Sequence, residues 1–224
     1  MAPGWLDRVL VLAPHVDDET IGCGALLASL GSRAVVRVFG TSDYAPLVGD
    51  PITQPQRLAE FAAAMDLLGV EDYGVLYEGA ERNLAGIGRT ALVTRLDALL
   101  AEVRPTAVFT ALPSHHQDHT EAFQATLSAL RMRPSLYGLR AVLTYEYPHA
   151  DLFPGAHPES GFVYFDGSAF VDQKRAALRA HASQLTPHPD RWLDSVLVLR
   201  WGEKRGIEAG TAFAEKFYLL RFCF

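Results

Sequence analysis

The chain has 224 residues, of which 49% are hydrophobic and 21% charged, a composition that excludes an intrinsically disordered protein and suffices for a sizeable core. Its formal net charge is −6 and no run is rich in Lys and Arg, so neither a nucleic acid nor an anionic membrane surface is an expected partner. Two cysteines, Cys23 and Cys223, are too few for a disulfide framework, and the chain shows neither a signal-peptide pattern nor an apolar run approaching ~20 residues, so we expect a cytoplasmic protein without a membrane span.

Apolar strands alternate with helices along the chain. In order, we expect a strand at residues 8–13, a helix at 18–30, a strand at 34–39, a helix at 54–68, a strand at 73–77, a helix at 90–103, a strand at 107–112, a helix at 120–132 and a strand at 141–147. After a loop rich in Pro, Gly and His at residues 148–160, we expect a strand at 162–165, helices at 170–182 and 190–205, and a closing strand at 217–222. The alternation predicts a single α/β domain over residues 1–224, with a Rossmann-like open, mainly parallel sheet and helices on both faces.

A first polar cluster follows the first strand directly. After Pro14 come His15, Asp17, Asp18 and Glu19, which stand at the start of the first predicted helix. Three adjacent acids repel one another unless a cation lies between them. The cluster therefore indicates a metal site.

A second polar cluster, residues 113–119, follows the fourth strand about a hundred residues later. In a Rossmann-like strand order the first and fourth strands are neighbours, and ligands bind beyond their carboxyl ends where the strand order reverses. The predicted fold thus brings the two clusters together.

Three residues of these clusters suit a catalytic metal. His15, Asp18 and His119 supply two imidazoles and one carboxylate, which leaves coordination positions for water and substrate, as in catalytic rather than structural zinc sites. Such a zinc ion lowers the pKa of bound water to about 7 and polarises a carbonyl. Nitrogen and oxygen ligands accept Fe²⁺ as well as Zn²⁺.

Neighbouring residues suit proton transfer. We expect Asp17 to face the same space without binding the metal and to act as the general base. His116 could donate a proton to a leaving amine, with Asp118 fixing its tautomer. His115 falls outside the His-x-Asp-His spacing and is expected to be exposed in the loop, but the acid could be either His115 or His116.

Together these motifs resemble the LmbE-like/PIG-L family of zinc-dependent N-acetylglucosaminyl deacetylases. The resemblance rests on several elements in the same order, which are His-x-Asp-Asp-Glu from His15, Arg57-x-x-Glu60, His-x-Asp-His up to His119, Lys174 with His181-x-Ser183-Gln184, and Ala214-Glu215-Lys216-Phe217. It implies hydrolysis of the acetamide of an N-acetylated sugar or glycoconjugate, with the same metal ligands and general base. It also implies that His116 stabilises the oxyanion or protonates the amine, and that Arg57 contacts the substrate.

Three positions depart from the family pattern. Val16 and Gln117 stand where relatives usually or often have proline, and neither needs to bind the metal. Residues 40–46 replace a Gly-Glu-containing stretch of many relatives, and we expect Asp43 and Tyr44 of this segment to contact the substrate. The sequence leaves the identity of that substrate open.

Two other functions use the same residues. His15-x-Asp17 with His119 also forms a two-His-one-carboxylate triad, as in non-haem Fe(II) oxygenases, which commonly have a jelly-roll fold. The chain could alternatively be a non-catalytic sugar-binding relative with a vestigial site.

The apolar residues 218–224 could support a homo-oligomer.

Overall fold

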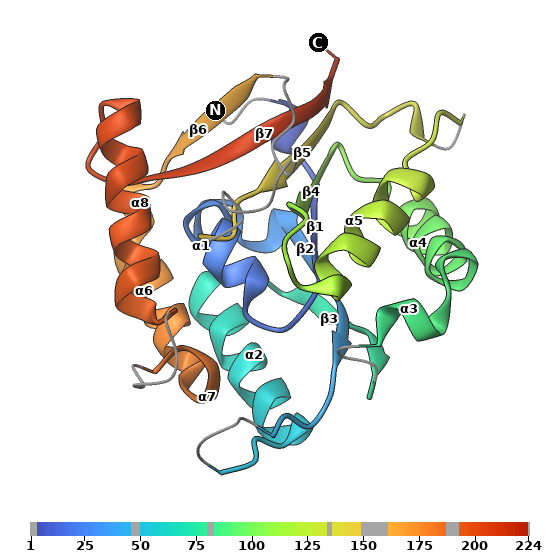
Figure 1. Ribbon diagram of the computed structural model, residues 1–224. Coiled ribbons are helices and arrows are strands. Elements are labelled where there is room, and N and C mark those ends of the chain that lie inside the picture. The colour runs from blue at the N-terminus through green and yellow to red at the C-terminus, as the bar shows by residue number, and fades with distance from the viewer. Residues whose placement is uncertain are drawn as a thin grey trace.

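The computed structural model of the protein describes residues 4–45, 50–79, 83–133, 136–148, 161–186 and 193–223. Its strands form one sheet in the order β3-β2-β1-β4-β5-β7-β6 (Figure 1). The pairs from β3 to β5 are parallel, and β7 runs antiparallel between β5 and β6. The expected α/β fold with an open, mainly parallel sheet is confirmed.

The elements have the following bounds. The strands are β1 (Val9–Ala13), β2 (Ala34–Thr41), β3 (Asp72–Glu78), β4 (Ala107–Ala111), β5 (Ala141–Tyr145), β6 (Phe162–Asp166) and β7 (Ala214–Phe222). The α-helices are α1 (Asp18–Leu30), α2 (Gln54–Leu68), α3 (Leu84–Ile87), α4 (Arg89–Val103), α5 (Gln117–Ala129), α6 (Val171–Ala180), α7 (Ala182–Leu185) and α8 (Ser195–Ala209). Within the described ranges, no helix has the length and apolar character that a membrane crossing requires.

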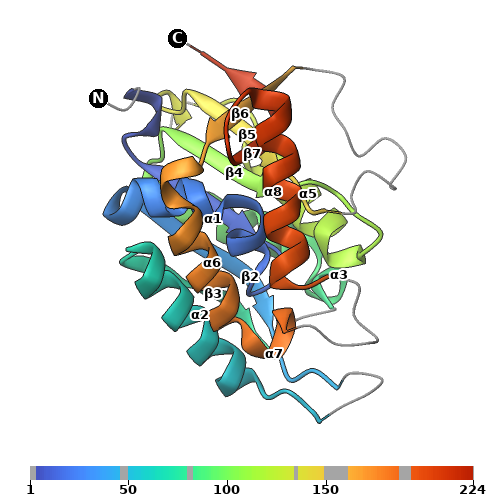
Figure 2. The same cartoon turned by 90° about the vertical axis from the view of Figure 1, so that its left-hand side faces the viewer.

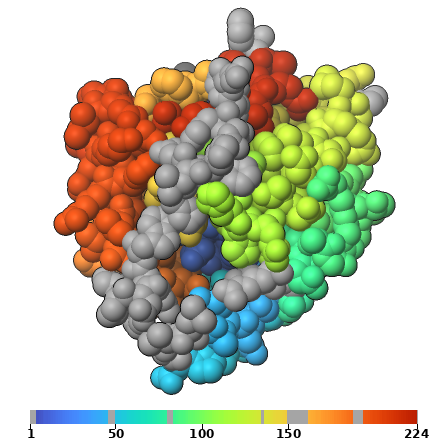
Figure 3. All heavy atoms as spheres, in the orientation of Figure 1, coloured from blue at the N-terminus to red at the C-terminus, as the bar shows by residue number. Residues whose placement is uncertain are grey.

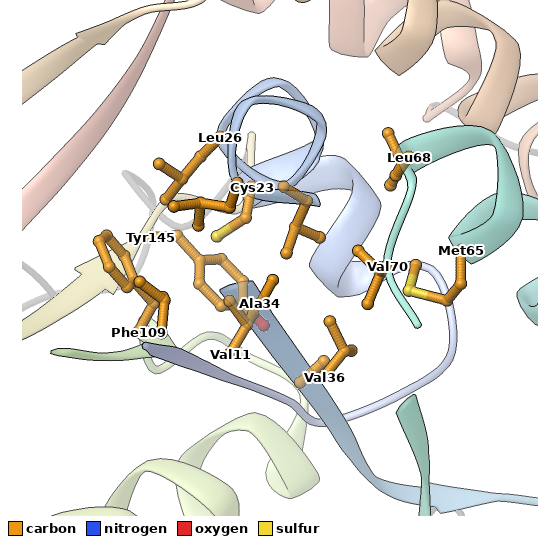
Figure 4. Close-up of a cluster of buried hydrophobic side chains, with 14 of the residues drawn as sticks. Val11, Cys23, Leu26, Ala34, Val36, Met65, Leu68, Val70, Phe109 and Tyr145 are labelled. Carbon is orange, nitrogen blue, oxygen red and sulfur yellow. The ribbon is translucent and has the colours of Figure 1, made fainter. Parts of the chain in front are cut away.

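Helices cover both faces of the sheet because successive strand residues point to opposite sides. Val9 and Val11 of β1 belong to a core that α1 and α2 close (Figure 4). Leu10 and Leu12 belong to a second core, closed by α4 and α5. Figures 1 and 2 show α1, α2, α6 and α8 on one side of the sheet and α3, α4 and α5 on the other.

The strand order reverses beside β1. The chain leaves β1 for β2 on one side and later returns as β4 on the other, with Leu12 of β1 aligned with Thr110 of β4. The two segments that follow β1 and β4 therefore emerge side by side, as the sequence predicted.

Some boundaries differ from the expected ones. Helix α5 begins at Gln117 rather than at residue 120, because the side chain of His116 caps it by accepting a hydrogen bond from the backbone N–H of Asp118. Helix α8 extends to Ala209, beyond the expected end, and the short helix α3 was not expected. Most of the predicted loop at residues 148–160 lies outside the described residues.

Candidate metal-dependent active site

A cavity of about 210 Å³ lies at the carboxyl ends of β1 and β4. Its lining comes from the two polar clusters and from four other parts of the chain, and consists of His15, Asp17, Asp18, Tyr44, Arg57, Ser114, His116, His119, Tyr147 and Gln184. In Figure 3, blue atoms from the N-terminal part of the chain are visible in a hollow near the centre of this face.

Three donor atoms converge in the cavity. Oδ2 of Asp18 lies 3.4 Å from Nδ1 of His15 and 3.3 Å from Nε2 of His119, and all three side chains are buried. A tetrahedral zinc ion with bonds of about 2.0–2.1 Å holds its ligand atoms about 3.3–3.4 Å apart. The spacing of these donors therefore fits a divalent metal ion.

A second ligand set shares two of these residues. The nitrogens of His15, His116 and His119 lie within 4.8 Å of one another. The distances from Oδ2 of Asp18 to the two shared histidines are 3.4 and 3.3 Å. The pKa of Asp18 also lies well below its ordinary value, because the neighbouring His119 and His15 outweigh the effect of burial. A carboxylate that stays ionised while buried suits a metal ligand better than the outer histidine does.

Asp118 sets the orientation of His15. Its Oδ2 lies 3.2 Å from Nε2 of His15, and its Oδ1 accepts a hydrogen bond from the backbone N–H of Leu84. With Nε2 protonated toward this carboxylate, Nδ1 of His15 presents its lone pair on the side of Asp18. A carboxylate behind a histidine is the usual arrangement around metal-binding histidines.

Asp118 contacts His116 through its backbone N–H, whereas its carboxylate contacts His15. We expected Asp118 to fix the tautomer of His116, but its carboxylate contacts His15. The tautomer of His116 is fixed by the backbone N–H of Asp118, which donates to Nδ1 at 3.2 Å. A neutral His116 then carries its proton on Nε2. The sequence shows the His-x-Asp-His spacing but cannot show which histidine the carboxylate reaches.

Asp17 has a backbone conformation that is rare for a residue with a side chain. Its φ is 121°, and its backbone N–H donates to Oε2 of Glu19 at 3.1 Å. Burial and the adjacent Asp18 raise the pKa of Asp17 well above its ordinary value, while Arg57 opposes the shift. Backbone strain and a raised carboxyl pKa both concentrate at functional sites.

Glu19 stabilises the turn at Asp17 by accepting its backbone N–H. Its side chain is fully buried, and its Oε1 accepts a hydrogen bond from the hydroxyl of Thr20 at 2.8 Å. Nε2 of His181 lies 3.4 Å from the same oxygen. Glu19 thus contacts both Asp17 and His181, so it does more than supply a negative charge to the first turn of a helix.

Of the three residues expected to contact the substrate, Arg57 and Tyr44 line the cavity and Asp43 does not. Arg57 is 2% exposed, donates from Nη1 to the carbonyl of Ser42 and lines the cavity together with Tyr44. Asp43 is not among the lining residues. Its carboxylate instead accepts the backbone N–H of Gln54 at the start of α2, at 2.7 Å. A capping role of this kind is common for Asp and was not distinguished in the sequence from substrate binding.

The remaining motifs connect the helices around the site. Glu60 of α2 accepts hydrogen bonds from the backbone N–H and the hydroxyl of Ser183 in α7. Glu215 of β7 accepts the backbone N–H groups of Ala25 and Leu26 in the middle of α1 and pairs with the buried Lys174 at 2.6 Å. These contacts hold α1, which carries Asp18 and follows Asp17 directly, against the rest of the fold.

Sequence reasoning assigned no role in the site to Ser114 and Tyr147, and it gave Gln184 at most an orienting one. Ser114 accepts the backbone N–H of His116 at 3.1 Å, and Tyr147 packs edge-on against His119. Tyr147 follows the carboxyl end of β5, the neighbour of β4, so the rule that placed the two polar clusters could also have found it. Gln184 follows no strand, and its position depends on the packing of α6 and α7.

Fold and site together define an α/β protein with a buried group of two histidines and one aspartate where the strand order reverses. A family model described as PIG-L, GlcNAc-PI de-N-acetylase matches residues 10–130. The chain belongs to this family, which confirms the resemblance seen in the motifs.

Its relatives carry names of sugar deacetylases. A 1D-myo-inositol 2-acetamido-2-deoxy-α-D-glucopyranoside deacetylase of Geodermatophilus obscurus is 30% identical over 80% of this chain and 83% of its own length. A probable N-acetyl-α-D-glucosaminyl L-malate deacetylase of Bacillus subtilis is 25% identical over 80% of this chain and 83% of its own length. The solved structure of a conserved protein from Thermus thermophilus is similar to this fold, with a TM-score of 0.71, 27% identity, and coverage of 97% of this chain and 96% of that one.

Proposed function

We propose that the protein is a metal-dependent N-deacetylase that hydrolyses the acetamide of an N-acetylglucosamine-type sugar or glycoconjugate. The observation that carries this proposal is the convergence of His15, Asp18 and His119 at the spacing of ligands in a tetrahedral site, with Asp17 beside them in the same cavity. Names of the relatives in two organisms, which both include an N-acetylated glucosamine unit, support the reaction.

His15 through Nδ1, Asp18 through Oδ2 and His119 through Nε2 would hold the metal. When bound, Zn²⁺ or Fe²⁺ would supply the Lewis acidity that activates water and polarises the carbonyl of the acetamide. Asp118 keeps the lone pair of His15 directed at the site, as its contact with Nε2 indicates. The protein contributes the rest of the chemistry through side chains that accept, hold and return protons.

Asp17 takes the proton from the attacking water as the new C–O bond forms. Its raised pKa, which results from burial and the adjacent Asp18, makes its carboxylate a stronger base than an exposed aspartate. When the C–N bond breaks, the same carboxyl group can return the proton to the amine nitrogen, so the products are acetate and a free amine. His116, with its proton on Nε2, hydrogen-bonds the carbonyl oxygen as negative charge develops there.

Arg57 and Tyr44 offer hydrogen bonds to the sugar. The guanidinium of Arg57 is buried at the wall of the cavity, where its donors match the hydroxyl groups of a pyranose. The name of one relative contains inositol beside the glucosamine unit, and the name of the other contains malate. We therefore restrict the proposal to the N-acetylated sugar and leave the attached group open.

An oxygenase that uses the same triad is not proposed, because this chain has a mainly parallel α/β sheet rather than the jelly-roll expected for that reaction. A vestigial sugar-binding site is also not proposed, because the strained Asp17 is maintained beside the metal ligands.

The proposal is tested by measuring acetate release from a panel of N-acetylglucosamine conjugates, with protein loaded with Zn²⁺ or Fe²⁺ and with protein treated with a chelator. We expect metal-dependent release by the wild type and a loss of at least about 100-fold in kcat for Asp17→Asn. Asp97→Asn is the matched control, since Asp97 pairs with Arg131 and Arg133 and lies outside the cavity lining. Equal activity of wild type and Asp17→Asn would overturn the assigned mechanism.

A further inference from the structure

We propose that Tyr147 is a positioning residue for His119, and that Glu146 holds Tyr147 in place. The inference rests on the proposed function only in taking His119 as a metal ligand. It assigns a role to two residues that no family motif described above includes.

The ring of Tyr147 contacts the ring of His119 edge-on. Their centroids are 5.3 Å apart and the rings are perpendicular, at 90°. This edge-to-face geometry is the favourable one for aromatic pairs. Because Tyr147 also lines the cavity, the contact lies at the metal site itself.

The two ligand histidines are held in different ways. His15 is oriented by the carboxylate of Asp118 on the nitrogen that faces away from the metal. Among the residues that the structure describes, no hydrogen-bond partner is found for Nδ1 of His119, which is buried. Ring contacts therefore limit the rotation of His119. The rings of His15 and His116 are tilted against it, and Tyr147 supplies the edge-to-face contact.

Tyr147 is itself confined by apolar residues on two sides. It packs against one cluster that includes Ile21 and Leu178, and against a second formed by Leu112 and Tyr218. The ring cannot rotate away from His119 without disturbing both clusters. A confined aromatic ring can thus set the position of a ligand without binding the metal.

Glu146, the preceding residue, is held by donors from two elements. Arg205 of α8 donates from Nε at 2.8 Å and from Nη2 at 2.6 Å, which forms a bidentate pair. Trp201 of α8 and Tyr218 of β7 each donate at 3.0 Å. Bidentate pairs of this kind fix geometry as well as charge. The backbone that carries Tyr147 is therefore fixed to α8 and β7.

The decisive measurement is the affinity for Zn²⁺, obtained by competition with a chromogenic chelator, in Tyr147→Leu and Tyr147→Phe. We expect Tyr147→Leu to weaken Zn²⁺ binding by about 10-fold, which is the lower end of the effect of removing a group that orients a ligand. Tyr147→Phe keeps the ring that contacts His119 and should therefore retain the wild-type affinity.

Tyr73→Leu is the matched control. It removes a tyrosine ring from a similar edge-on contact, with Phe61 at 5.4 Å and 83°, on the edge strand β3 and not at the cavity. Its Zn²⁺ affinity should equal that of the wild type even if its thermal stability falls as much as that of Tyr147→Leu. This comparison separates positioning of the ligand from a general loss of stability.

Trp201→Phe tests the part played by Glu146. It removes one donor from the carboxylate and should weaken Zn²⁺ binding in the same direction by a smaller factor, while an unchanged affinity would overturn the role of Glu146. Unchanged affinity in Tyr147→Leu, or an equal loss in Tyr147→Phe, would overturn the role of the Tyr147 ring. A wild-type protein that binds no divalent metal would overturn the proposed function as well, which distinguishes the two failures.

Discussion

Nε2 of His15 lies 3.2 Å from Oδ2 of Asp118, a residue 103 positions further along the chain. This contact joins the two polar clusters, one after β1 and one after β4, and it leaves Nδ1 of His15 on the side of Asp18 at 3.4 Å. The two clusters thus share one hydrogen-bonded group, in which Asp118 of the second cluster orients His15 of the first.

Replacement of Asp118 by Asn should weaken metal binding. The amide cannot accept a proton-bearing Nε2 with the strength of a carboxylate, so His15 loses both its orientation and some of its basicity. We expect a loss of Zn²⁺ affinity of roughly 10- to 100-fold, the range for partners of ligand histidines. Chelator competition measures it.

Asp97→Asn provides the control for that experiment. Asp97 pairs with Arg131 and Arg133 at the surface, away from the cavity lining, and its replacement removes the same charge. Its Zn²⁺ affinity should not change. If Asp118→Asn bound Zn²⁺ as tightly as Asp97→Asn does, the orienting role of Asp118 would be wrong.

Metal binding should stabilise the fold. Because the three donors come together only in the folded chain, Zn²⁺ at 100 times its Kd adds about 2.7 kcal/mol to the free energy of unfolding. For a chain of this size that corresponds to a rise in Tm of about 5–10 °C. Differential scanning calorimetry with and without Zn²⁺ measures the rise, and Asp18→Asn should abolish most of it. A rise of the same size in Asp18→Asn would exclude Asp18 as a ligand.

Much of this arrangement follows from local sequence patterns. Helices α1 and α2 have the predicted bounds, because Gly31 and Gly69 end them and their apolar residues recur at helical spacing. The meeting of His15 with His119 followed from the rule that ligands bind where strand order reverses. These predictions needed only periodicity and topology.

Other features depend on contacts between distant segments. Whether the carboxylate of Asp118 contacts His15 or His116 depends on how the two loops after β1 and β4 pack together. The spacing of residues in the sequence does not determine this. Tyr147 reaches His119 because Glu146 is fixed by Arg205 of α8. The predicted bounds of that helix, 190–205, differ from the observed Ser195–Ala209. The strained φ of Asp17 likewise results from packing of the turn against Glu19 and is not visible in the residue type.

Gly22→Ala should destabilise the helix that carries the acids. A Cβ at Gly22 would lie 2.1 Å from Cδ2 of Tyr145, whose ring is held by a hydrogen bond from its hydroxyl to the carbonyl of Leu12. Overpacking of this kind costs about 1–3 kcal/mol, which exceeds the gain of about 1 kcal/mol from replacing a helical glycine. Urea denaturation measures the difference. Gly24→Ala is the control, since the nearest atom to its Cβ would be Cγ of Lys174, at 2.9 Å rather than 2.1 Å, and it should cost less.

Glu208 should make part of the stability dependent on pH. Burial alone would raise the pKa of Glu208, but hydrogen bonds from Tyr164, Arg205 and Lys204 outweigh it and hold the pKa at about 2, below the usual 4.5. A carboxyl group whose pKa is depressed by folding contributes stability that is fully present above the pKa of the unfolded chain and is lost as the pH falls toward the folded value. The difference in unfolding free energy between wild type and Glu208→Gln should therefore be constant above about pH 5.5 and shrink from about pH 4.5 downward. Urea denaturation of both proteins between about pH 3 and pH 7 measures this difference, and one that stayed constant down to about pH 3 would show that folding does not shift the pKa of Glu208.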